Sequence, residues 1–178
     1  MIGMSRIFTI AAGLAALSLA SLALAQEPVS ALKGHDADAP IDVAADRIEV
    51  QDRSDRAVFA GNVQVRQASL TLETARLTVA YSSGGGIQIR RLDASGGVTV
   101  KSPSETARGN FGIYDLDRKL ITLVGAVQLN RDGSQINGQR LTIDLNTGRA
   151  VVDGGPAGVG QSGGRVTGRF TVPRRGGN

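Results

Sequence analysis

Residues 160–164 read Gly-Gln-Ser-Gly-Gly and match the Gly-x-Ser-x-Gly motif that surrounds the nucleophilic serine of many hydrolases. Such a serine needs a strand before it, a helix after it and a histidine that takes up its hydroxyl proton. The only histidine, His35, lies far upstream, and the residues after Ser162 do not predict a helix. The overlapping Gly-x-Gly-x-x-Gly match at 158–163 lacks the βαβ pattern of a dinucleotide site. We therefore expect a glycine-rich loop with no catalytic residue.

Five other side chains belong to types that bind metals or transfer protons, but their spacing supports neither role. His35, Asp36 and Asp38 stand together in a polar stretch, without a cysteine or a second histidine to complete a metal site. Glu73 and Glu105 are isolated carboxylates, whereas glycoside hydrolysis uses a pair. We therefore expect no metal ion, no cofactor and no enzymatic activity.

The charged residues give little support for a nucleic-acid partner. The 178 residues include 20 Lys and Arg against 16 Asp and Glu, which leaves a net charge of +4. Arginine alternates with aspartate along most of the chain, and the one dense basic cluster is the arginine pair at 174–175. Nucleic-acid surfaces usually combine clustered basic residues with aromatic side chains. We therefore expect no binding to nucleic acid.

The N-terminal residues predict export. Arg6 gives the start a positive charge, residues 7–24 form an apolar run, and alanines stand one and three positions before Gln26. We expect a Sec-type signal peptide over residues 1–25, cleaved between Ala25 and Gln26. An uncleaved membrane anchor is the alternative, because the apolar run could nearly span a bilayer. The chain contains no cysteine, so the exported domain must fold without disulfide bonds.

Beyond the signal peptide, the chain has the pattern of short strands joined by turns. Apolar and polar residues alternate from Ile41 onwards, which gives each run one apolar face, and Gly, Asn, Asp and Ser separate the runs. We expect an all-β domain over residues 40–153, preceded by a flexible leader at 26–39. Residues 154–178 read as a glycine-rich segment, a last strand around 166–172 and a disordered basic tail.

Four glycines mark a weak internal repeat. Gly61, Gly96 and Gly125 each stand at the start of a short apolar alternation, and Gly154 marks a degenerate fourth copy. Gly125 and Gly154 each follow the preceding marker by 29 residues, while Gly96 follows by 35, with six extra residues that fit in the loop at 82–86. Such a period predicts stacked units that share one core. A chain of this kind is typical of a scaffold or trough.

Several short motifs, in this order and spacing, resemble the LptA/OstA family of periplasmic lipopolysaccharide-transport proteins. They are Pro-Ile-Asp-Val with Ala-Asp at 40–46, Ala-Val-Phe-Ala-Gly-Asn-Val at 57–63, Tyr-Asp-Leu and Leu-Val-Gly-Ala-Val within 114–127, and Ile-Asn-Gly with Leu-Thr-Ile within 136–143. The resemblance covers about residues 38–153. The glycine-rich residues that follow depart from the family pattern.

The resemblance implies an antiparallel β-jellyroll or solenoid-like trough, here built from units of about 29 residues and open at both ends. It also implies a periplasmic protein that binds lipopolysaccharide, with the acyl chains of lipid A in an apolar groove and the sugars and phosphates outside. The partners that it implies are an LptC-like inner-membrane subunit, an LptD-like outer-membrane translocon, and further copies joined head to tail through edge strands.

The apolar positions of the alternating runs are the candidate groove residues. They are mostly Val, Ile and Leu, which leave more room for acyl chains than aromatic side chains would. We expect the lipid-binding groove to be lined by Ile41, Val43, Ile48, Val50, Val63, Val65, Leu77, Val79, Val98, Val100, Val127, Leu129, Leu141 and Ile143. The same residues would also serve to fill a closed core.

Two alternatives to a soluble carrier stay open. The chain could be a sister component with the same domain, although a cleavable signal disfavours an LptC-like anchor and 178 residues leave no room for the barrel of an LptD-like translocon. It could instead be an exported structural or adhesive β-solenoid, with a packed, dry core and no lipid ligand.

Overall fold

The computed structural model of the chain describes residue 32, residues 35–155 and residues 164–171. The expected signal peptide, residues 1–25, and the end of the basic tail, from residue 172 on, lie outside this part of the chain. Within it, no helix is both long enough and apolar enough to cross a membrane.

The described residues form ten strands and one short 3-10 turn, which confirms the expected all-β fold. All the strands belong to one antiparallel sheet. The elements are β1 (Ile41–Ala44), β2 (Arg47–Gln51), η1 (Asp52–Ser54), β3 (Arg56–Gln67), β4 (Leu70–Ser82), β5 (Gln88–Lys101), β6 (Glu105–Asp115), β7 (Leu120–Arg131), β8 (Ser134–Asp144), β9 (Arg149–Asp153) and β10 (Thr167–Arg169).

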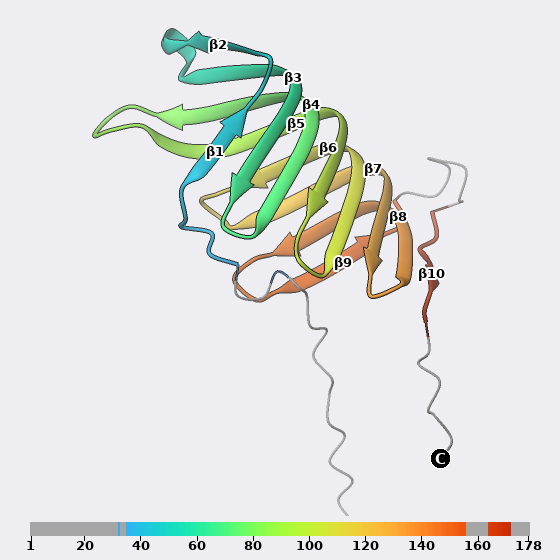
Figure 1. Cartoon of the computed structure of the whole chain (residues 1–178). Coiled ribbons are helices and arrows are strands. Elements are labelled where there is room, and N and C mark those ends of the chain that lie inside the picture. Colours follow the sequence, from blue (N-terminus) through green and yellow to red (C-terminus); the bar gives the residue numbers. More distant parts are fainter. Residues whose placement is uncertain (1–31, 33–34, 156–163, 172–178) are drawn as a thin grey trace, which may run out of the picture.

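Strands β3 to β8 form a continuous meander in which each strand pairs with the next one along the chain (Figure 1). At one end of the sheet, β1 and β2 both pair with β3. At the other end, β9 and β10 both pair with β8. Each edge of the sheet is therefore a single strand position that two short strands share.

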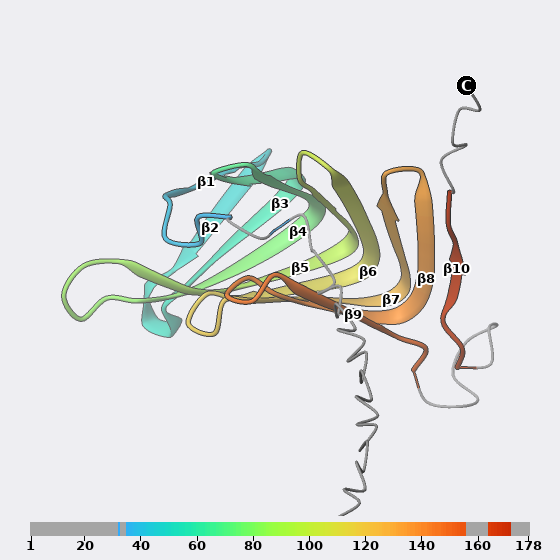
Figure 2. The same cartoon turned by 90° about the horizontal axis from the view of Figure 1, so that it is seen from below.

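Glycines at the predicted repeat positions bend the long strands. The pairing register shifts at Gly61 in β3, at Gly96 in β5 and at Gly125 in β7. These glycines have φ angles of 80°, 85° and 83°, and the residue after each of them also has a positive φ. Such β-bulges bend a strand, and Figure 2 shows the sheet folding over at this level. The 29-residue repeat is therefore a repeat of bends.

Side chains opposite the bulges leave no space for a Cβ atom. A Cβ at Gly125 would lie 2.9 Å from Asn110 Nδ2, and a Cβ at Gly96 would lie 2.8 Å from the Ala75 Cβ. Because the left-handed backbone also disfavours other residues, both the conformation and the packing require glycine here.

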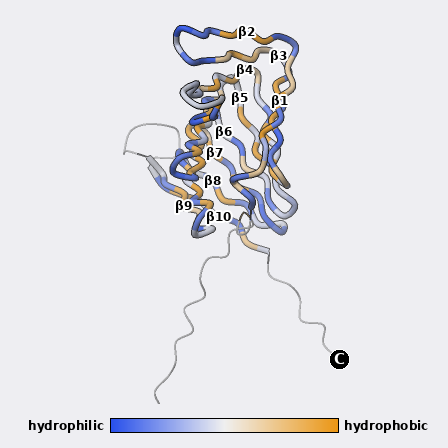
Figure 3. The backbone as a smooth tube through the Cα atoms, turned by 90° about the vertical axis from the view of Figure 1, so that its left-hand side faces the viewer, coloured by the Kyte–Doolittle hydropathy of each residue, from blue (hydrophilic) through white to orange (hydrophobic). Residues whose placement is uncertain are grey.

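The bends divide the sheet into two limbs, which we name after their edge strands. Besides β2 and β9, the β2–β9 limb contains residues 56–60, 76–82, 88–95, 111–115, 120–124 and 140–144. Besides β1 and β10, the β1–β10 limb contains residues 63–67, 70–74, 98–101, 105–109, 127–131 and 134–138. Apolar side chains of both limbs form one core between them, and Figure 3 shows hydrophobic and hydrophilic residues intermixed along the strands.

Cross-strand pairing aligns the core residues in inner rows, three of which run from one edge of the sheet to the other. A further row beside the bulges, in the β1–β10 limb, pairs Val63, Thr74, Val98 and Gly109, and then Val127 with Gly138. In the β2–β9 limb, the first inner row is Ile48, Phe59, Leu77, Ala94, Gly112, Leu123, Leu141 and Val152. The second inner row is Val50, Ala57, Val79, Leu92, Tyr114, Ile121, Ile143 and Ala150. In the β1–β10 limb, the third inner row is Val43, Val65, Leu72, Val100, Ala107, Leu129, Ile136 and Gly168.

The fourth repeat departs from the other three. Its marker, Gly154, directly follows the end of β9, and pairing with β8 resumes only in β10, at Thr167. β10 lies within the span 166–172, where the sequence pattern leaves room for a last strand. The strand position that should close this end of the sheet is therefore interrupted.

Candidate functional site

Most of the predicted groove residues point into the core between the limbs. Ten of the fourteen are buried, none with more than 7% of its surface exposed. These ten are Val63, Val65, Leu77, Val79, Val98, Val100, Val127, Leu129, Leu141 and Ile143. Ile41 and Val43, both in β1, are partly buried and pack against the same core. The pattern of alternation therefore locates the inner surface of the trough.

The remaining two predicted groove residues, Ile48 and Val50 in β2, are 55% and 56% exposed. They continue the first and second inner rows beyond Phe59 and Ala57. Among the described strands, none pairs with the outer edge of β2 and covers them. At this end of the sheet, the first and second inner rows therefore end in exposed apolar side chains.

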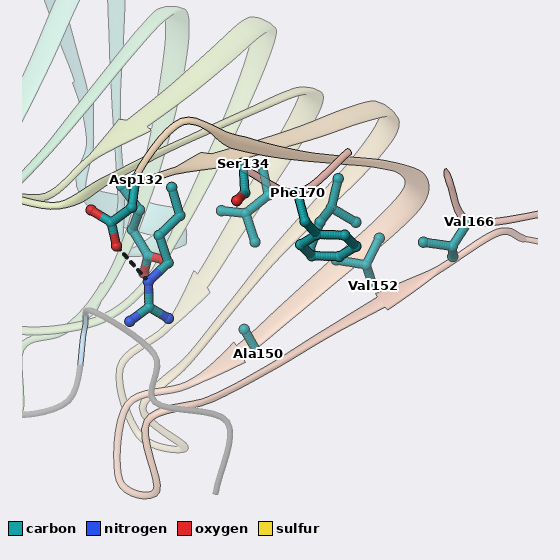
Figure 4. A pocket seen from close by; sticks show the side chains of 10 residues that line it. Asp132, Ser134, Ala150, Val152, Val166 and Phe170 are labelled. Carbon is teal, nitrogen blue, oxygen red and sulfur yellow. Dashed lines mark ion pairs between the residues drawn. The ribbon is translucent and has the colours of Figure 1, made fainter. Parts of the chain in front are cut away.

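The opposite end of the trough holds an open cavity of about 540 Å³ between β8, β9 and β10 (Figure 4). Leu129 and Ile136 come from the β1–β10 limb, and Ala150 and Val152 from the β2–β9 limb. Val166 and Phe170, on either side of β10, are 43% and 67% exposed. The complete lining is Glu105, Leu129, Arg131, Asp132, Ser134, Ile136, Ala150, Val152, Val166 and Phe170.

Charged side chains stand at one border of the cavity. Arg131 and Asp132, at the turn between β7 and β8, form an ion pair with 3.6 Å between Nε and Oδ2. Glu105 lies opposite Arg131 in the pairing of β6 with β7, and only 8% of its surface is exposed. An apolar cavity with a charged border suits an amphiphile, whose carbon chain enters while its polar head stays outside.

A glycine helps to keep this end open. Gly168 follows Leu129 and Ile136 in the third inner row, so no side chain continues that row in β10. A Cβ at this position would lie 2.9 Å from Cε2 of Phe170. Beyond β9 and β10, no further strand is described that would cover the cavity.

Sequence reasoning missed all the apolar residues of this cavity except Leu129. Ile136, Ala150, Val152, Val166 and Phe170 all line it, and none of them is among the fourteen predicted groove residues. Ala150 and Val152 alternate with outward residues, as the predicted residues do, so the alternation could have found them. Val166 and Phe170 belong to the predicted last strand, but the glycine-rich residues before them leave the register of that strand open.

A buried polar cluster lies near the other edge of the core, around Gln67 of β3. Gln67 is 2% exposed, and its Nε2 donates to the carbonyl oxygens of Ala37 at 2.9 Å and Ala39 at 3.0 Å. Its Oε1 accepts from the Tyr114 hydroxyl at 2.9 Å and lies 3.2 Å from Nε2 of His35. Burial raises the pKa of Tyr114 to about 12, so the phenol stays a neutral donor.

The polar residues of the leader contact different parts of the domain. His35 contacts Gln67, and Asp38 forms an ion pair with Lys119, with 2.9 Å between Oδ2 and Nζ. Asp36 is exposed and accepts a hydrogen bond from the backbone of Asp38. The three leader side chains that could suggest a metal site therefore point to different partners.

Three comparisons relate this chain to known proteins. A family model described as LptA/(LptD N-terminal domain) LPS transport protein matches residues 42–149. A Rhizobium meliloti protein named as uncharacterized is 35% identical over 151 residues, which is 80% of this chain and 81% of that protein. The family match ends at residue 149, so Val152, Val166 and Phe170 of the cavity lie beyond it.

The fold also resembles a solved structure. The crystal structure of LptH, the LptA homologous periplasmic component of the conserved lipopolysaccharide transport device of Pseudomonas aeruginosa, matches with a TM-score of 0.67. The two sequences are 19% identical, and the match covers 78% of this chain and 99% of LptH. At this level of identity the match shows that the two proteins share a fold.

Proposed function

The chain belongs to the LptA/LptD N-terminal-domain family of lipopolysaccharide transport proteins, and we propose that it is a periplasmic carrier that holds lipid A acyl chains between the two limbs. The observation that supports this function is the apolar cavity of about 540 Å³, which continues the inner rows and is open to solvent. Leu129 belongs to both the predicted groove and the cavity lining. In this proposal the cavity is the entrance to the predicted groove.

Binding would be driven by the burial of acyl chains and would include no covalent step. Each methylene group removed from water contributes about 0.8 kcal/mol, so a micromolar affinity, about 8 kcal/mol, needs the burial of about ten methylene groups. The charged border, with Arg131 and Asp132, would keep the sugars and phosphates of the headgroup outside. A passive groove of this kind cannot set the direction of transport, so a partner that spends ATP has to supply it.

The two ends of the sheet suit head-to-tail assembly, which is the second element of the proposal. One end offers the edge strands β1 and β2, with Ile48 and Val50 exposed; the other offers β9, β10 and the cavity. Edge strands have unpaired backbone groups that can add a strand from another chain. Stacked in this way, copies would continue the inner rows from one chain to the next. The same edges would join the chain to an LptC-like subunit and an LptD-like translocon.

Photo-crosslinking at two adjacent valines tests lipid binding. Val152 lines the cavity, whereas Val151 pairs with Thr142 and points to the outer face of β9. We expect a probe at Val152 to form adducts with lipopolysaccharide and a probe at Val151 to form none. If a folded protein gives adducts at neither position, the carrier function is wrong and the exported solenoid with a dry core becomes the better interpretation.

A further inference from the structure

One leader residue, Leu32, lies inside the core. It is 2% exposed, and its carbonyl oxygen accepts a hydrogen bond from the backbone N–H of His35 at 3.0 Å. It borders a small void of about 10 Å³ together with residues of both limbs. Val100, Ala107 and Leu129 of this void come from the β1–β10 limb, and Ile143 comes from the β2–β9 limb. Leu32 therefore sits between the two limbs.

The position of Leu32 is next to the open cavity. Leu129 and Glu105 border both the cavity and the small void beneath Leu32. On one side of Leu129 there is room for about 540 Å³ of ligand, and on the other side about 10 Å³ is left. The open part of the trough ends where the leader enters it.

Polar contacts hold the rest of the described leader against both limbs. Gln67, from the β1–β10 limb, binds the carbonyl oxygens of Ala37 and Ala39. The Tyr114 hydroxyl reaches the same Gln67 from the β2–β9 limb. Lys119, in the turn between β6 and β7, pairs with Asp38. Figure 2 shows the described leader, in blue, running ahead of β1.

This arrangement holds the leader by few interactions. The leader places one fully buried leucine side chain in the core, and the small side chain of Ala37 packs against it. The ion pair with Lys119 is largely exposed, with 79% of the Asp38 side chain open to solvent. An acyl chain has more carbon atoms than a leucine side chain. It therefore buries more apolar surface when it takes the place of Leu32 between the limbs. A lipid can therefore compete with the leader for the space between the limbs.

We propose that residue 32 and residues 35–39 form a displaceable plug, which occupies the trough beyond Leu129 until an acyl chain expels it. The proposal rests on the function proposed above, because the lipid is the competitor. It gives the carrier two states: a short cavity at the β9 and β10 end with the plug in place, and a longer groove after the plug has left.

The absence of cysteine from the chain allows a direct test by thiol labelling. In a Leu32→Cys variant the thiol is protected by the core, so a maleimide reacts only when the leader opens. We expect saturating lipid A to raise the labelling rate by about tenfold or more. Asp36→Cys, on the exposed side of the same leader, should react fast with and without lipid.

A reversible lock tests whether plug release matters for binding. Cysteines in place of Asp38 and Lys119 are joined by a short bis-methanethiosulfonate crosslinker, which forms a disulfide with each thiol and releases a sulfinate each time. This crosslink fixes the leader against the turn between β6 and β7. The matched control replaces Glu73 and Lys101, an outer-face pair with a similar separation of 2.8 Å between Oε1 and Nζ. We expect the leader lock to weaken lipid A binding about tenfold, reduction to restore it, and the control lock to leave it unchanged.

The outcomes separate the plug from the carrier function. If Val152 forms lipid adducts but Leu32→Cys stays equally protected and both locked proteins bind lipid A alike, the carrier function stands and the plug is wrong. If the unlocked chain gives no adduct at Val152, the carrier function fails and the plug fails with it.

Discussion

Leu129 stands at the boundary between two regions of the interior that are built alike and filled differently. On the side of Ile136 it borders the open cavity. On the side of Val100 and Ala107 it borders the space that Leu32 fills. Side chains of both limbs line each region, so the wall does not decide what fits. The leader fills one region, whereas Gly168 and the interrupted fourth repeat leave the other open.

This difference separates two tasks within one fold. The bulge repeat makes a uniform apolar wall, because each copy adds two inner side chains per limb at the same height. The ends of the domain, which do not follow the repeat, determine where the space between the limbs is open. Variants that change the wall, the leader or the open end should therefore have effects of different kind and size.

The largest loss of stability is expected where the wall is fully packed. Leu123, in the first inner row, is 0% exposed, so Leu123→Ala should lower the free energy of unfolding by about 3 kcal/mol. Val152 lies in the same row but borders the cavity, and Val152→Ala should cost about 1 kcal/mol or less. Denaturant unfolding of both variants measures the difference. Equal losses would mean that the cavity is packed as tightly as the middle of the core.

A second, smaller loss is expected at the bends. Gly125 has a φ of 83°, and a Cβ there would lie 2.9 Å from Asn110 Nδ2, so Gly125→Ala should cost about 2 kcal/mol. Gly84, in the loop between β4 and β5, has open space around it, and Gly84→Ala should leave the free energy of unfolding nearly unchanged. Chemical denaturation again provides the measurement, and equal stability of the two variants would show that the bulge at Gly125 does not require glycine.

The wall was accessible to sequence reasoning because its signals are local. Alternation marks an inward residue such as Leu77 or Leu141, and the spacing of Gly61, Gly96 and Gly125 marks the bends. The exposure of Ile48 was not accessible in this way. It depends on β2 being an edge, which follows from the order of strands in the sheet and not from any local pattern.

The sequence also did not indicate which part of the interior the leader fills and which part stays open. Leu32 stands in a polar leader without any periodicity, so nothing in the sequence indicates that it returns to the core. The open cavity depends on Gly168 standing in an inner row next to Ile136. That register is set only after the chain has skipped from β9 to β10, and a glycine in a glycine-rich segment gives no sign of it.

High pH should destabilise the fold through Tyr114, a buried residue of the second inner row whose hydroxyl donates to Gln67. The Tyr114 hydroxyl has a pKa of about 12 in the folded protein, against about 10 when exposed. The folded state thus holds this proton more tightly, and its stability should fall as the pH rises from 10 toward 12. Tyr114→Phe should remove much of that fall, at a cost of about 1 kcal/mol at neutral pH for the lost hydrogen bond to Gln67.

A second, partly buried tyrosine provides the control for this pH experiment. Tyr81 also has a raised pKa, since some burial and the nearby Asp52 disfavour its phenolate, but it lies at the end of β4 and outside the leader contacts. Tyr81→Phe should therefore remove a smaller part of the alkaline loss. Unfolding curves recorded from neutral pH up to about pH 12 compare the variants. A Tyr114→Phe protein with the full alkaline loss would show that other groups cause it.

The smallest effect on stability, with a clear effect on binding, is expected from filling the open end. Gly168→Val would place a side chain beside Ile136 in the third inner row, and the 67% exposed Phe170 ring is free to swing away from it. The free energy of unfolding should change by about 0.5 kcal/mol or less, while lipid adducts at Val152 fall. Thr167→Val, on the outward face of the same strand, is the matched control. If both variants bind lipid as the unchanged chain does, the cavity is not where the acyl chains enter.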